Sequence, residues 1–223
     1  DIKSYDYRKF LNINRKLLTD VSYIINCTSN KQYVNKKYSE KNDFDFQISK
    51  KIKDLNCKMI FLTSRKIYKL GDNLNESSEL KPNCNYSKNK LHTEKILLKN
   101  LKNRILILRI SNLIGISKFR NNNKKIHKTF IDSFFLNVQR GIIFNNKKNY
   151  KDFLSINKFG EIIEKLINKK VVGIYNVSLG QKVYLTKLVN WLNLFNKNKY
   201  KSIDIPKGNK TECFYLNNDK LMK

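Results

Sequence analysis

Short apolar runs rich in β-branched residues alternate along this chain with segments of helical periodicity. The apolar runs occupy Val21–Cys27, Met59–Leu62 and Ile105–Ile110. Each run is nearly unbroken, which is typical of a strand that is covered on both faces of a sheet. Residues 44–55 and 91–101, between the runs, carry apolar side chains at helical spacing. This alternation predicts right-handed βαβ crossovers, and therefore an α/β fold with a parallel sheet.

The alternation falters after Gly115 and returns further along the chain. A polar stretch follows Gly115, which suggests an insertion or a small second lobe. The later elements are predicted as helix 126–138, strand 141–144, helix 156–167, strand 173–178 and helix 185–195.

The formal net charge of +28 makes nucleic-acid binding a first hypothesis. The basic residues are 39 Lys and only seven Arg, whereas phosphate and base recognition favours the bidentate Arg fork. The chain also contains 32 Asn and no Ala. This composition is expected when GC-rich codons are avoided across a whole genome, whatever each protein does. We therefore expect no nucleic-acid partner, and polyanion binding is the less favoured alternative.

The four cysteines lie far apart and form no C-x-x-C pair, so neither a metal site nor a disulfide framework is expected. No apolar run approaches the ~20 residues of a membrane span, and the first residues lack the apolar core of a signal peptide. The expected protein is cytoplasmic, with reduced thiols and no membrane association.

Tyr86 and Lys90 form the most informative local pattern, at the start of the predicted helix that ends near residue 101. Positions i and i+4 share a helix face, so the phenol and the ammonium can point into one cleft. A nearby cation favours the phenolate, which would let the pair exchange a proton with a hydroxyl or carbonyl substrate. The same spacing recurs by chance at Tyr33 and Lys37, so it does not identify a site by itself.

Thr63 and Ser64 end the predicted buried strand about twenty residues upstream of Tyr86. Ligands bind at the carboxyl ends of strands in open α/β sheets. A hydroxyl there could bind the same substrate oxygen that Tyr86 protonates. Without Tyr86, the simpler interpretation of Ser64 is a turn-forming serine.

Five motifs follow one another in a familiar order. They are TSRKIY (63–68), ESSELKPNCNYSKNKLHTEKIL (76–97), LRISNLIG (108–115), YKDFLSINKFGEII (150–163) and GIYNVSLGQKVYLTKLVNWL (173–192). Together they resemble the extended short-chain dehydrogenase/reductase family, in its NAD-dependent sugar-nucleotide epimerase/dehydratase branch. The resemblance implies a Rossmann-type doubly wound parallel sheet with a small C-terminal substrate-binding lobe.

The resemblance also implies roles for individual residues. Tyr86 becomes the acid/base, and Lys90 its electrostatic partner and a ligand of the nicotinamide ribose. Ser64 would bind the reacting sugar oxygen. Asn112 would contact the substrate diphosphate, and Lys151 stands where family members carry an Arg that contacts the nucleotide. A capping Asn and a surface Lys are the alternatives for the last two.

Other residues match the family's cofactor-binding positions. The cofactor implied is NAD or NADP, and the substrate is a nucleotide sugar. Asp1 and Ile2 match a pair that holds the adenine ring, Lys31 lies in the loop past the cofactor, and Asn42 matches an Asn of the next helix. Thr63 is also expected to bind the cofactor. An exposed terminal residue without a role is the alternative for Asp1.

The sequence departs from the family at the phosphate loop. Its seven glycines form neither G-x-G-x-x-G nor G-x-x-G-x-x-G, which a bound pyrophosphate requires. At ~30 residues per strand-helix-strand unit, roughly 60 residues with the first two strands are missing, so we expect an amino-terminally truncated sequence. The expected domains are a partial dinucleotide-binding domain, 1–115, to which about 150–178 returns, and a substrate-binding lobe, 116–149 and 179–223.

Arg65 and Lys66 narrow the range of reactions that the chain is expected to catalyse. The family's 4,6-dehydratases carry Asp-Glu at these positions to supply acid and base for loss of water, so elimination is disfavoured here. The chain is expected to be a nucleotide-sugar epimerase or keto-sugar reductase of surface polysaccharide synthesis. A homodimer is one expected assembly. A non-catalytic dinucleotide-binding scaffold or sensor of the same fold is the alternative.

Overall fold

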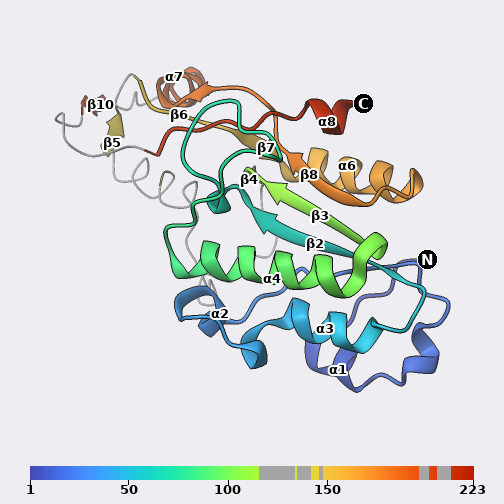
Figure 1. Cartoon of the computed structure of the whole chain (residues 1–223). Coiled ribbons are helices and arrows are strands. Elements are labelled where there is room, and N and C mark those ends of the chain that lie inside the picture. The colour runs from blue at the N-terminus through green and yellow to red at the C-terminus, as the bar shows by residue number, and fades with distance from the viewer. Residues whose placement is uncertain (116–133, 135–141, 146–147, 196–200, 205–211) are drawn as a thin grey trace. The chain divides into compact units, whose positions relative to one another are not determined.

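The computed structural model describes residues 1–115, 134, 142–145, 148–195, 201–204 and 212–223 (Figure 1). The chain divides into two compact units. Unit 1 comprises Asp1–Lys69, Ser78–Ile110 and Ile162–Asn176, and unit 2 comprises Leu70–Ser77, Ser111–Glu161 and Val177–Lys223. The helix predicted over 126–138 and the polar stretch before it lie outside the described residues, apart from Phe134.

Unit 1 is built on a four-stranded sheet in the order β1-β2-β3-β8 (Figure 1). Its strands are β1 (Tyr23–Ile25), β2 (Lys58–Ser64), β3 (Ile105–Ile110) and β8 (Gly173–Val177). The first three are parallel, with Ile25 opposite Ile60 and Ser64 opposite Ile110. Every residue of β3 is buried, which explains its unbroken apolar run. The predicted α/β fold with a parallel sheet is confirmed.

The core of unit 1 lies between one face of this sheet and three helices. They are α1 (Tyr7–Asn12), α3 (Phe44–Ile52) and α4 (Asn85–Leu101). Since side chains alternate along a strand, Met59 and Phe61 of β2 point to the same face. They pack with apolar residues of all three helices and with Ile105 and Ile107 of β3. Figure 1 shows α3 and α4 running beneath the strands.

Short turns and one small helix connect these elements. Helix α2 (Lys31–Asn35) begins at Asn30, whose side chain accepts from the Gln32 amide. Helix α3 begins at Asp43, whose carboxylate accepts from the Phe46 amide at 3.0 Å. Capping of this kind satisfies backbone donors that have no partner inside a helix. The single 3-10 turns are η1 (Arg15–Leu18), η2 (Glu40–Asn42), η3 (Arg65–Ile67) and η4 (Lys102–Arg104).

Arg104 holds the carboxyl end of α3. Its guanidinium donates to the carbonyls of Ile52 at 3.3 Å and Cys57 at 3.4 Å, and also to those of Lys53 and Leu55. These carbonyls belong to the last residue of α3 and to the loop that follows it, up to the residue before β2. One side chain therefore fixes the turn that leads from α3 into β2.

The carboxyl end of α6 (Ile156–Asn168) lies against β1 and β2 in unit 1. The Tyr23 hydroxyl donates to the Ile167 carbonyl at 3.3 Å, and the Lys58 ammonium donates to the Lys170 carbonyl at 2.9 Å. Lys58 is an even-numbered residue of β2, whereas the core described above uses the odd-numbered ones. The second half of α6 therefore contacts the other face of the sheet.

The described residues of unit 2 form three two-stranded sheets. Their strands are β4 (Asn112–Ile114) with β7 (Phe153–Ser155), β6 (Tyr150–Lys151) with β9 (Val183–Tyr184), and β5 (Ile142–Asn145) with β10 (Lys201–Asp204). The helices α7 (Leu185–Phe195) and α8 (Asp219–Met222) also belong here. The buried Asp152 carboxylate accepts from the backbone amides of Leu179 at 3.1 Å and Leu216 at 3.0 Å. It thereby joins three segments that are far apart in sequence.

The units do not coincide with the domains expected from the sequence, because residues 150–161 belong to unit 2. Compact units do not define folding domains by themselves, so the expected domain boundaries stay a prediction. Among the described residues, no helix is both long and apolar enough to cross a membrane.

Candidate active site

Tyr86 and Lys90 lie one turn apart near the start of α4. The Ser87 hydroxyl accepts from the Cys84 amide at 3.2 Å, which fixes the beginning of the helix. Tyr86 is half-buried in the first turn, and Lys90 is 7% exposed one turn further along. The structure thus brings these two predicted residues to one helix face. Within the part of the chain that is described, no hydrogen bond to the Tyr86 hydroxyl is found, so this hydroxyl can serve a ligand.

The Lys90 ammonium is enclosed by two aromatic rings and a carboxylate. Its Nζ lies 3.5 Å from Oδ2 of Asp45 on α3, 4.6 Å from the centre of the Phe61 ring and 5.6 Å from that of Tyr33. Asn26, which follows β1, donates to Oδ1 of Asp45 at 3.0 Å. Burial raises the pKa of Asp45, whereas the Lys90 charge and the Asn26 hydrogen bond act to lower it.

A second buried polar chain lies beside this ion pair. The hydroxyls of Tyr33 and Thr93 are 2.7 Å apart, and the Thr93 hydroxyl donates to the Asp43 carboxylate at 2.5 Å. Burial raises the pKa of Tyr33, and the charge of Asp43 and the proximity of Tyr86 raise it further. Tyr33 therefore keeps its proton at neutral pH and serves as a hydrogen-bonding group.

Thr63 and Ser64 lie at the carboxyl end of β2, as predicted. Thr63 is on the same strand face as Phe61, and its buried hydroxyl has no hydrogen-bond partner among the described residues. Ser64 follows with the opposite orientation, at the edge of the strand. Its Oγ accepts from the Lys66 amide at 3.2 Å and caps η3. Ser64 therefore does form a turn, and its hydroxyl proton remains available for donation.

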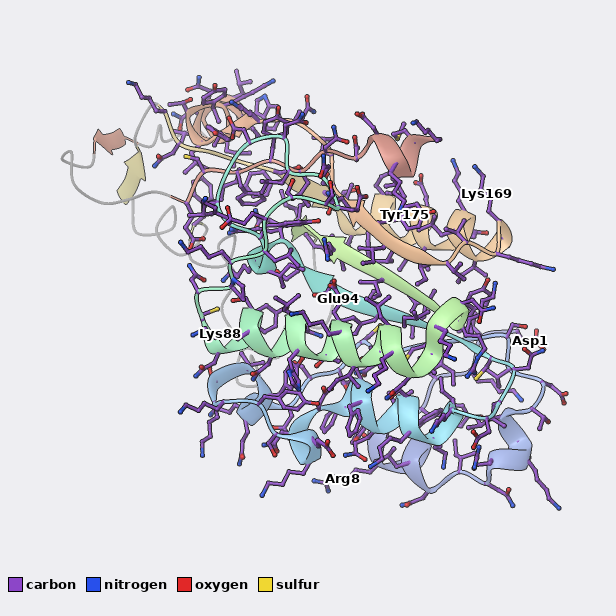
Figure 2. All side chains as sticks on the ribbon, viewed as in Figure 1. Asp1, Arg8, Lys88, Glu94, Lys169 and Tyr175 are labelled. Atoms are coloured by element: carbon purple, nitrogen blue, oxygen red, sulfur yellow. The ribbon has the colours of Figure 1, made fainter. Side chains whose placement is uncertain are left out.

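Glu94, a buried residue of α4, has a structural role. Its carboxylate lies 2.5 Å from the Arg109 guanidinium, and both side chains are 3% exposed. Arg109 also donates to the Tyr68 hydroxyl at 2.8 Å, and that hydroxyl donates to Asn176 at 2.8 Å. In Figure 2 Glu94 rises from α4 toward the strands, whereas Lys88 lies near the beginning of the helix. This network ties α4 to β3 and β8, and so holds the Tyr86 turn in place.

The other predicted cofactor-binding residues, which include the expected adenine-binding pair, also belong to unit 1. Asp1 and Ile2 are exposed, and Figure 2 shows Asp1 toward the opposite end of α4 from Lys88. Lys31 is exposed at the start of α2. Asn42 accepts from Asn30 at 3.3 Å, within the loop between α2 and α3. The structure does not bring Asp1 and Ile2 to Tyr86, and their cofactor role stays a prediction.

The residues near the start of α4 and the end of β2 fit the nicotinamide end of a dinucleotide. The unpartnered Thr63 hydroxyl and the Lys90 ammonium are donors that could hold the nicotinamide ribose. The pyrophosphate needs a glycine-rich loop before a helix, and the sequence has none. In the described residues, an added Cβ would be crowded by Ile156 at Gly115 and by Asn218 at Gly180, so these glycines serve packing within the chain.

Two of the predicted substrate-binding residues, Asn112 and Lys151, belong to unit 2, whereas Ser64 belongs to unit 1. The Asn112 side chain donates to the Asp152 carbonyl at 2.9 Å. Lys151 is only 8% exposed and donates to the Glu212 carbonyl at 2.7 Å, so it is not a surface lysine. Both side chains have structural partners, and their contacts with a substrate remain predictions.

Sequence reasoning missed Asp45, Tyr33 and Thr93. One signal was present: Asp45 occupies the apolar stripe of α3 that continues with Ile48 and Ile52. An acidic residue on a buried helix face needs a partner, and Lys90 is that partner. Within the described ranges, no group of three or more His, Cys, Asp or Glu side chains could hold a metal ion.

A parallel sheet with helices packed against both faces is the architecture of Rossmann-type α/β proteins, which bind ligands at the carboxyl ends of the strands. The chain belongs to the NAD dependent epimerase/dehydratase family, whose family model matches residues 8–178. It is therefore an enzyme of an NAD-dependent family, in agreement with the resemblance of its motifs. A search of curated proteins found no match.

Solved structures share this fold. UDP-N-acetylglucosamine 4-epimerase from Methanobrevibacter ruminantium M1 is 20% identical, with a TM-score of 0.74 over 94% of this chain and 72% of that one. UDP-glucuronic acid 4-epimerase from Bacillus cereus, solved with UDP-glucuronic acid and NAD, is 16% identical, with a TM-score of 0.74 over 97% and 72%. dTDP-glucose 4,6-dehydratase from Bacillus anthracis str. Ames is 18% identical, with a TM-score of 0.67 over 93% and 69%.

Proposed function

We propose that this chain carries the acid/base machinery of a nucleotide-sugar epimerase or keto-sugar reductase that uses NAD or NADP. The observation that supports it most is the pairing of a half-buried Tyr86, whose hydroxyl has no hydrogen-bond partner in the described part, with the buried cation of Lys90 one turn away. The similar solved structures include two 4-epimerases of UDP-sugars, which favours this class.

Tyr86 takes the proton of a sugar hydroxyl when that carbon is oxidised and returns it when the carbonyl is reduced. The Lys90 cation favours the phenolate form during this exchange. Bound NAD supplies the hydride acceptor and donor. Ser64 donates its proton to the reacting oxygen, because the Ser64 oxygen already accepts from the Lys66 amide. Thr63 and Lys90 hold the nicotinamide ribose, and Asn112 and Lys151 contact the nucleotide diphosphate.

Elimination of water is a poorer fit than epimerisation or reduction. Arg65 is 7% exposed and Lys66 is half-buried, so two basic residues follow Ser64 where a dehydratase needs an acid and a base. Only hydride exchange with the cofactor and the Tyr86 proton are needed for epimerisation through a transient ketone. The products would enter surface polysaccharide synthesis, which rests on analogy alone.

Replacement of Tyr86 by Phe tests the proposal, because it removes one hydroxyl and keeps the ring. We expect turnover of the matching nucleotide sugar, found with a panel of UDP- and dTDP-sugars, to fall ~10²- to 10⁴-fold. Tyr5→Phe is the control, since Tyr5 is 50% exposed and should leave turnover unchanged. A Tyr86→Phe rate within about threefold of the parent would place the acid/base elsewhere.

The second candidate is a non-catalytic scaffold or sensor with the same fold. The contacts of Asn112 and Lys151 favour it, because both side chains already donate to carbonyls within the chain. The same substrate panel separates the two candidates. A scaffold would turn over none of the sugars, and Tyr86→Phe would then change nothing.

A further inference from the structure

Asp45 and Lys90 form the most deeply buried ion pair that involves a proposed site residue. The two side chains are 7% and 9% exposed, and Oδ2 and Nζ are 3.5 Å apart. A buried ammonium without a counter-charge tends to lose its proton, because burial disfavours the charged form. The reaction proposed above needs Lys90 as a cation, and Asp45 has no part in that scheme.

We propose that Asp45 is a positioning residue that holds the Lys90 ammonium in place through the buried ion pair. The inference rests on the proposed function, because it concerns the electrostatic partner of Tyr86. Asp45 itself is fixed by the Asn26 amide at 3.0 Å and by its place on α3. The rings of Phe61 and Tyr33 leave the ammonium little freedom to move away from the carboxylate.

Asp45 is the carboxylate in contact with Lys90, although Asp43 lies nearby. The Asp43 carboxylate is occupied by the Phe46 amide and the Thr93 hydroxyl. The charges of Asp43 and Asp45 also raise the pKa of neighbouring groups, namely Tyr7 of α1, Cys27 after β1, Tyr33 of α2 and Tyr38. Tyr86 lies on the same helix as Lys90. None of these groups can replace Asp45, because a neutral phenol or thiol supplies no negative charge at neutral pH.

The consequence is a defined change in the Lys90 ammonium when the charge of Asp45 is removed. Ammonium protons held in a buried ion pair are protected from exchange with water, so the parent should give a resolved Hζ–Nζ NMR signal for Lys90. In Asp45→Asn the ammonium loses the carboxylate that lies 3.5 Å away, and this signal should be lost. Asp45→Glu keeps the charge and should keep the signal.

The experiment observes the Lys90 ammonium directly, in the full chain without cofactor. Protein labelled with 15N at lysine Nζ is examined by NMR at one fixed pH, and the Lys90 signal is assigned by its loss in Lys90→Met. Asp54→Asn is the matched control, since Asp54 is a surface carboxylate, 72% exposed, paired with Arg15. It should leave the Lys90 signal unchanged.

A Lys90 ammonium signal in Asp45→Asn that is as strong as in the parent overturns the proposal. If Asp45→Asn does not fold, Asn26→Ala takes its place, because it removes the donor that fixes the carboxylate. A weaker Lys90 signal is then expected, and an unchanged signal is again a refutation. The readout is independent of turnover, so loss of the acid/base assignment for Tyr86 would be seen separately in the Tyr86→Phe assay.

Discussion

The buried pairing of Lys90 with Asp45 gives Lys90 two roles that mutations can separate. As a cation, it supports the Tyr86 phenolate in the proposed reaction. As the partner of Asp45, it keeps a carboxylate from being buried alone, 3.5 Å from its own Nζ. Removal of one member of a buried pair leaves an uncompensated charge, whereas removal of both need not destabilise the protein.

Lys90→Met should therefore lower stability as well as activity. We expect a loss of about 3 kcal/mol in the free energy of unfolding, reduced where Asp45 takes up a proton. The double variant Lys90→Met with Asp45→Asn should regain most of that stability and none of the turnover. Denaturant unfolding and the sugar panel measure the two quantities. Equal stability of the single and double variants would contradict the pairing.

At the scale of single residues, the sequence predicted the residues of the site that follow local patterns and missed those that depend on distant partners. Tyr86, Lys90, Thr63 and Ser64 were found because local periodicity places them at a helix start and a strand end. Asp45, Tyr33 and Thr93 were not, because their partners are 45 to 60 residues away in sequence. Lys151 was expected at the surface as an alternative, and its burial depends on a contact with the distant Glu212.

At the scale of elements, unbroken apolar runs and long helical patterns predicted the structure best. Strand Ile105–Ile110 was predicted at its observed bounds because all six of its residues are buried. Helices α1 and α2 were missed. They have six and five residues, too few to show a 3.6-residue period. Their existence depends on caps at Asp6 and Asn30 and on packing against the rest of unit 1.

Asp152 makes the link between strands β6 and β7 sensitive to pH. Burial raises the pKa of its carboxyl to about 6 from about 3.8, although several hydrogen bonds to the carboxylate act in the opposite direction. The folded chain then binds this proton more tightly than the unfolded chain between about pH 4 and pH 6. Stability contributed by Asp152 is thus present at low pH and is lost as pH rises through this range, by about 3 kcal/mol.

Denaturant unfolding from pH 4 to pH 7 measures this dependence. Asp152→Asn removes the titration, so the stability of the parent relative to the variant should fall with rising pH. The variant should also be less stable throughout, since an amide has one acceptor oxygen for the amides of Leu179 and Leu216. Lowered pKa values at Asp72 and Glu79 act in the opposite direction in both proteins and cancel in the comparison. Parallel pH curves would show that Asp152 does not titrate there.

For the whole molecule, the missing glycine loop predicts weak cofactor binding by these 223 residues. The groups that fit the nicotinamide ribose, Lys90 and Thr63, hold one end only, and the pyrophosphate finds no close backbone approach. Isothermal titration calorimetry with NAD and with NADP should detect no binding at micromolar concentrations. The Bacillus cereus epimerase, solved with NAD, is the positive control. A micromolar dissociation constant would show that other residues bind the pyrophosphate.

The guanidinium of Arg104 donates to four carbonyls at and after the end of α3. These contacts limit the substitutions that this lysine-rich sequence can accept during evolution. A lysine there would keep the charge and lose the planar fork, so several acceptors would go unfilled. Arg109, held between Glu94 and Tyr68, is in the same situation. Drift toward lysine should therefore stop at these two positions while it proceeds freely on the surface. Arg104 and Arg109 therefore join segments of the fold in a way that a lysine could not.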